Sequence, residues 1–61
     1  MALEFRRRLV VVDDEPIIRT LIAAKFTELG FEAWPAADAL EAKKLVKTKD
    51  PDALVVDLDL G

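Results

Sequence analysis

Two short runs of apolar residues constrain the fold of this chain more than any other feature. They are Leu9-Val10-Val11-Val12 and Ala53-Leu54-Val55-Val56, and each stops at an aspartate. Both runs are unbroken and rich in β-branched residues, which is typical of strands covered on both faces in a parallel sheet. A buried helix segment is the competing interpretation, but such short runs do not favour it. The two runs therefore predict two buried strands.

The stretch between these runs has the periodicity of two helices. The first, from about Pro16 to Leu29, begins with a proline suited to the first turn and stops before Gly30. The second, from about Asp38 to Lys47, has an N-cap aspartate followed by Glu41, as in a capping box. One face of the first helix is predicted to be apolar; its residues are Ile17, Ile18, Leu21, Ile22, Phe26 and Leu29.

A third strand is predicted between the helices, at Phe31–Trp34, so the element order is β-α-β-α-β. Such alternation indicates an α/β fold with a parallel sheet and right-handed crossovers. If the chain reverses direction between its two crossovers, the strand order is 2-1-3. The helices then cover opposite faces, and a crevice lies between the first and third strands. We predict this half of a doubly wound parallel sheet.

Acidic residues follow both strands that border this crevice. Asp13 and Asp14 follow the first strand and Asp57 follows the third. Neighbouring parallel strands lie about 4.8 Å apart, so their carboxyl ends bring these side chains close together, at the edge where such sheets bind ligands. Mg²⁺ prefers oxygen ligands and would relieve the repulsion between the carboxylates. A lone aspartate after a strand is more often a helix cap, but three at neighbouring strand ends favour a metal site.

Three segments, in order, resemble the receiver domain of two-component response regulators. The segment from Leu9 to Pro16 is similar to the opening strand and acidic pair of that family. The segment from Ala36 to Ala42 is similar to the entry into its second helix, and that from Pro51 to Leu60 to its third strand. The resemblance covers about Leu9 to Gly61 and implies the N-terminal half of a flavodoxin-like fold.

The resemblance assigns roles to four aspartates. Asp57 would be the phosphoacceptor, taking its phosphoryl group from a phosphohistidine on a sensor histidine kinase or a phosphotransfer protein. Asp14 would bind Mg²⁺ directly and Asp13 mainly through water, while Asp59 stands where the family supplies a backbone carbonyl to the metal. The module is then a phosphoacceptor and not an enzyme. Its chemistry requires a cation, because an anionic nucleophile attacks an anionic donor.

Residues 9–61 are expected to form a truncated receiver domain, preceded by a lead-in of residues 1–8 that is partly vector-derived. Complete receivers have a fourth strand ending in Ser or Thr and a fifth carrying Lys, and both contact the phosphoryl group. Four lysines lie on or after the second helix, too far from the crevice to substitute, so we expect impaired phosphotransfer; they are Lys43, Lys44, Lys47 and Lys49. An open third strand also predicts a symmetric homodimer, paired strand to strand.

Other classes of function are weaker alternatives. Val55–Asp59 resembles the first motif of haloacid-dehalogenase-type phosphatases, but that family carries the motif near its first strand. A purely structural, self-associating half-domain is the remaining alternative. The net charge of −3 does not indicate a nucleic-acid partner, and Arg6–Arg8 is interpreted as a solvated lead-in. There is no cysteine, signal segment or apolar run of roughly 20 residues, so a cytoplasmic location without membrane contact is expected.

Overall fold

The computed structural model of the chain describes residues 7–57. These residues form a three-stranded parallel sheet in the order β2-β1-β3, with a helix in each crossover. The predicted α/β fold and the 2-1-3 strand order are therefore confirmed. The elements are β1 (Arg8–Val12), α1 (Pro16–Glu28), β2 (Glu32–Ala36), α2 (Ala39–Lys49) and β3 (Ala53–Val56).

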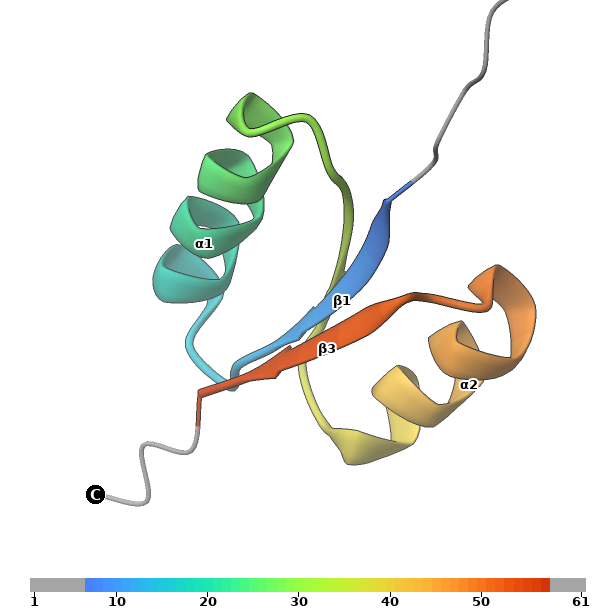
Figure 1. Cartoon of the computed structure of the whole chain (residues 1–61). Coiled ribbons are helices and arrows are strands. Elements are labelled where there is room, and N and C mark those ends of the chain that lie inside the picture. The colour runs from blue at the N-terminus through green and yellow to red at the C-terminus, as the bar shows by residue number, and fades with distance from the viewer. Residues whose placement is uncertain (1–6, 58–61) are drawn as a thin grey trace, which may run out of the picture.

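The central strand β1 carries the core. Leu9, Val10 and Val11 are almost completely buried, because β2 and β3 flank the strand and a helix lies over each face (Figure 1). In register, Val10 lies beside Trp34 of β2 and Leu54 of β3. The unbroken apolar run of β1 is thus explained by burial on both faces.

The outer strands are more exposed and differ from prediction at their ends. Strand β2 begins and ends later than the expected Phe31–Trp34 and includes Pro35. Proline is compatible with this place because β2 is an edge strand, where a backbone N–H can be missing without breaking the ladder. Strand β3 forms the other edge of the described sheet, and its side chains are mostly exposed although the sequence predicts a buried strand.

The two helices cover opposite faces of the sheet, as expected (Figure 1). Helix α2 contacts β1 and β2 and contributes Ala42 to a core cluster with Val10 and Ala36. Val12, Trp34 and Leu45 are partly buried and pack against this cluster. Neither helix described in residues 7–57 is long and apolar enough to cross a membrane.

The apolar face of α1 is only partly covered. Ile22 and Phe26 are half-buried, whereas Ile17 and Leu21 are 75% and 61% exposed. The helix packs mainly on β2 and less on β1, and the sheet in residues 7–57 is too narrow to cover a stripe of this width. The sequence therefore predicts the face correctly but overestimates how much of it is buried.

Local signals account for both ends of α1. Pro16 occupies the first turn, where its missing N–H costs nothing. At the other end Gly30 has a φ of +94°, which suits glycine. The Phe31 N–H donates to the Phe26 carbonyl at 3.0 Å, and the two rings meet edge to face with centroids 5.6 Å apart. This is a Schellman-type stop with its apolar contact.

Helix α2 has the predicted capping arrangement, with one difference. The Glu41 backbone N–H donates to Asp38 Oδ1 at 2.8 Å, while Glu41 Oε2 accepts from the backbone N–H of Ala37 at 3.2 Å. The reciprocal bond thus reaches one residue further back than in the standard capping box. The helix continues to Lys49 and ends at Asp50, which has a φ of +48°.

Arg8 belongs to β1 and connects several elements. Its Nε lies 3.1 Å from Glu32 Oε2, and its Nη1 donates to the Lys49 carbonyl at 2.9 Å. Its backbone N–H donates to Asp52 Oδ2 at 2.9 Å. The interpretation of the basic cluster as a solvated lead-in is therefore wrong for Arg8, because this side chain joins β1 to β2 and to the end of α2.

Candidate functional site

The carboxyl ends of β1 and β3 lie side by side (Figure 1). Val12 and Val56 are paired in register, and the Asp57 N–H donates to the Val12 carbonyl at 3.0 Å. Asp13 and Asp57 therefore each follow a member of the same strand pair. The backbone positions of the two aspartates are neighbours at this edge of the sheet.

Asp13 is the buried acidic residue of this edge. Its side chain is only 3% exposed, and its backbone N–H donates to the Ala36 carbonyl of β2 at 3.1 Å. Its Oδ1 accepts a 2.9 Å hydrogen bond from the Glu15 N–H. Such an aspartate-to-backbone bond orders the turn from β1 into α1.

The second carboxylate oxygen of Asp13 has no hydrogen-bond partner among residues 7–57. Burying a carboxylate oxygen without a partner is costly, and buried charges in proteins are usually paired or coordinate a metal. Oxygen is also the donor type that Mg²⁺ prefers. Asp13 therefore fits a cation ligand better than it fits a simple turn residue.

Asp14 and Asp57 are exposed at the same edge. Within residues 7–57, no three acidic side chains lie close enough together to hold a metal ion jointly. The Asp13 carboxylate is turned towards the Glu15 amide, and close carboxylates repel one another when no cation lies between them. The assignment of Asp13, Asp14 and Asp57 to one metal site stays a prediction, and Asp59 lies outside the described residues.

Arg19 is a residue of this edge that the sequence reasoning missed. It lies near the start of α1, is half-buried, and its Nη1 donates to the Asp13 carbonyl at 2.8 Å. Arg19 does not belong to the apolar face that the periodicity of α1 predicts. Its position was the signal that could have identified it. A positive charge near a helix N-terminus is unfavourable because of the helix dipole, so a basic residue there suggests a specific partner.

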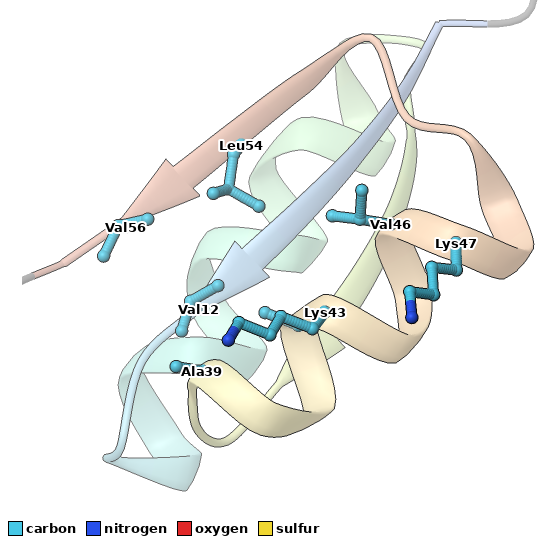
Figure 2. Close-up of a pocket in the computed structure, with 8 residues that line it drawn as sticks. Val12, Ala39, Lys43, Val46, Lys47, Leu54 and Val56 are labelled. Carbon is cyan, nitrogen blue, oxygen red and sulfur yellow. The ribbon is translucent and has the colours of Figure 1, made fainter.

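An apolar groove lies between α2 and the sheet, on the side of β3 (Figure 2). Its volume is about 410 Å³. Leu54, Val56 and Val12 line it from the sheet, and Lys43 and Lys47 stand on the helix side. Among the described residues, the walls of the groove are apolar apart from these two amines, so it is suited to an apolar or amphipathic occupant.

The fold and the acidic edge define a class of protein, and a family comparison agrees with it. Residues 9–61 match the family model of the response regulator receiver domain. The chain therefore belongs to the receiver-domain family. Because the match includes the third strand and its aspartate, the phosphatase alternative loses its support.

The relatives that the chain matches include a transcriptional regulatory protein, a response regulator and a phosphotransferase. The chain is 37% identical over 54 residues to the alkaline phosphatase synthesis transcriptional regulatory protein PhoP of Bacillus subtilis, covering 88% of this chain and 22% of that protein. It is 41% identical over 49 residues to an NtrX-like response regulator of Rickettsia conorii, covering 80% and 10%. It is 30% identical over 53 residues to sporulation initiation phosphotransferase F of Bacillus subtilis, covering 87% and 43%.

The chain thus spans less than half the length of each of these relatives. No solved structure matches it significantly.

Proposed function

We propose that this chain is a phosphoacceptor module of a two-component signalling system, with Asp57 as the residue that is phosphorylated. The carrying observation is the buried Asp13 carboxylate, which has one oxygen without a partner among residues 7–57. Asp13 directly follows Val12, and Asp57 directly follows Val56, the residue paired with Val12 in the sheet. The Asp57 backbone is hydrogen-bonded to Val12, so the two aspartates are neighbours. Membership of the receiver family supports the same assignment.

The proposed cofactor is Mg²⁺, held by the carboxylates of Asp13, Asp14 and Asp57, with the Asp59 carbonyl as a further ligand. Bound there, the cation would screen the negative charges of nucleophile and donor. The buried Asp13 oxygen supports this set, since a cation would compensate for its lost hydration. The exposed position of Asp14 leaves it accessible to a partly hydrated ion.

The proposed reaction is a phosphoryl transfer from a phosphohistidine of a sensor histidine kinase or phosphotransfer protein. An Asp57 carboxylate oxygen forms a bond to phosphorus as the phosphorus–nitrogen bond breaks. The electron pair of that bond stays on the imidazole, which takes up a proton from solvent. Asp57 lies at the edge of the sheet and is exposed, as a group that meets a donor on another protein must be. We place this exchange in the cytoplasm.

Phosphorylation of the 61-residue chain by acetyl phosphate with Mg²⁺, followed by intact mass measurement, tests the proposal. We expect slow, partial gain of one phosphate, because none of the 61 residues corresponds to the hydroxyl and lysine with which complete receivers stabilise the transferred group. The gain should be absent with EDTA and in Asp57→Asn, and present in the control Asp52→Asn. Phosphate on Asp57→Asn would contradict the choice of residue, and rapid stoichiometric gain would contradict the expected impairment.

We also propose that the 61-residue chain pairs with a second copy along β3. Within residues 7–57 this strand borders β1 on one side only, and Leu54 and Val56 are 51% and 42% exposed. Exposed apolar edges favour strand pairing. The Asp57 N–H bonds to the Val12 carbonyl of β1, so by alternation the backbones of Leu54 and Val56 are directed outward.

A two-fold axis at Val55 is the register that suits these side chains. It would set Leu54 of one copy beside Val56 of the other and Asp57 opposite Ala53, so that Asp57 does not directly face Asp52 of the second copy. The two grooves would then lie on one continuous face. Such a contact is isologous and closes without further growth.

A further inference from the structure

Arg19 reaches from α1 back to the end of β1. Its backbone N–H donates to the Glu15 carbonyl at 2.9 Å and so belongs to the first turn of the helix. Its Nη1 donates a partly buried hydrogen bond of 2.8 Å to the backbone carbonyl of Asp13. A bond from a charged donor is stronger than one between neutral groups. This bond offsets the unfavourable position of a cation near a helix N-terminus.

Asp13 is consequently held from three directions. Its N–H is bound to Ala36 of β2, its Oδ1 to the amide of Glu15, and its carbonyl to Arg19. The peptide plane that joins Asp13 to Asp14 is fixed by the last of these bonds. The remaining carboxylate oxygen of Asp13, Oδ2, has no hydrogen-bond partner among the described residues.

We infer that Arg19 is a positioning residue of the acidic edge, holding the Asp13–Asp14 peptide so that both carboxylates can bind one divalent cation. The inference rests on the proposed function, since it concerns the same cation. Arg19 acts through the Asp13 carbonyl, which makes it an outer-sphere partner of the site. Without its bond, the peptide can rotate, and the position of the Asp14 carboxylate relative to Asp13 Oδ2 is no longer fixed.

The sign of the effect separates this role from simple electrostatics. A positive charge close to an acidic site repels a bound cation, so removing the charge should strengthen metal binding if charge is all that matters. Removing a positioning bond should weaken metal binding instead. Loss of an outer-sphere partner typically lowers metal affinity by about tenfold or more.

The test uses Mn²⁺, which takes the same oxygen ligands as Mg²⁺ and whose free concentration is measured by electron paramagnetic resonance. We expect Arg19→Gln to weaken Mn²⁺ binding about tenfold. Arg19→Lys keeps the positive charge and can still donate a hydrogen bond to the Asp13 carbonyl. Its affinity for Mn²⁺ should therefore lie between that of Arg19→Gln and that of the unsubstituted chain. Lys25→Gln removes the same charge from an exposed part of α1, near Glu28, and should leave the affinity unchanged.

Folding of each variant is checked by circular dichroism and by the fluorescence of Trp34, the single tryptophan. If Arg19→Gln does not fold, the weaker binding expected of Arg19→Lys carries the test. Binding by folded Arg19 variants that equals or exceeds that of the unsubstituted chain would overturn the inference and leave the proposed metal site standing. If the unsubstituted chain shows no saturable Mn²⁺ binding, or if Asp14→Asn does not weaken it, the proposed site itself fails, and with it the role of Arg19.

Discussion

The side chain of Asp13 affects both the stability of this molecule and its proposed binding of a cation. A turn aspartate at a protein surface keeps its hydration, whereas Asp13 is 3% exposed and uses only one carboxylate oxygen for a hydrogen bond among residues 7–57. A buried carboxylate of this kind lowers the stability of the metal-free fold. The same oxygen is preorganised for a cation, so the cost to folding and the capacity for binding have one origin.

We expect Asp13→Asn to be more stable than the unsubstituted chain in EDTA and less stable than it in Mg²⁺. In EDTA we expect its free energy of unfolding to rise by about 1 kcal/mol, because a buried charge is removed while the acceptor for Glu15 is kept. At a Mg²⁺ concentration about 100 times the dissociation constant, the unsubstituted chain should gain about 2.7 kcal/mol and the variant little. Urea unfolding followed by Trp34 fluorescence measures both.

The control for this reversal is Asp52→Asn, which alters an exposed acceptor of the Arg8 N–H far from the acidic edge. Its response to Mg²⁺ should match that of the unsubstituted chain. Equal stabilisation of Asp13→Asn by Mg²⁺ would show that Asp13 does not bind the ion.

At the scale of elements, local end signals determine where the helices begin and stop. Helix α2 is short and has only Ala42 buried, so its packing contributes little and its caps contribute proportionally more. Asp38 satisfies the Glu41 N–H, which would otherwise be one of the unpaired amides of the first turn. The helix also carries Lys47 and Lys49 in its last turn, where positive charge is favourable.

Replacing the N-cap of α2 should therefore be costly. We expect Asp38→Ala to lower the free energy of unfolding by about 1 kcal/mol. Glu28→Ala removes the same charge from an exposed ion pair with Lys25, 3.9 Å apart, and should change stability by less than about 0.5 kcal/mol. Urea unfolding of the two variants in EDTA makes the comparison, and equal losses would contradict the capping role.

At the scale of the whole molecule, the described sheet leaves apolar surface uncovered on both faces. On one side lies the groove lined by Leu54, Val56 and Val12, and on the other lie the exposed Ile17 and Leu21 of α1. A domain of this size buries only about 60% of its unfolded surface and is marginally stable. Burial of either surface against another chain would add to its stability.

Self-association through β3 is tested by Leu54→Lys. A lysine at this edge position should weaken pairing at least tenfold, because a charge on an edge strand opposes contact with a second strand. Leu40→Lys places the same charge on an exposed position of α2 that does not line the groove and should leave association unchanged. Light scattering across a concentration series measures both. A folded, monomeric unsubstituted chain at micromolar concentration would contradict the proposed pairing.

Much of the fold was predictable from the sequence, because its signals act over short distances along the chain. Unbroken β-branched runs predict β1 and β3, and Pro16, Gly30 and Asp38 mark helix ends through contacts with residues a few positions away. Alternation of strands and helices then leaves few possible topologies. The family resemblance, carried by the same motifs, is confirmed over residues 9–61.

The rest was decided by residues that are distant in the sequence. The burial of Asp13 and its unpartnered oxygen depend on β2 and α1 closing around it, and the bond from Arg19 depends on how α1 leaves the sheet. Arg8 forms a hydrogen bond to the Lys49 carbonyl because the end of α2 lies beside the start of β1. Periodicity reports which face of an element is apolar, but only packing determines how much of that face is covered and which polar atoms are left without water.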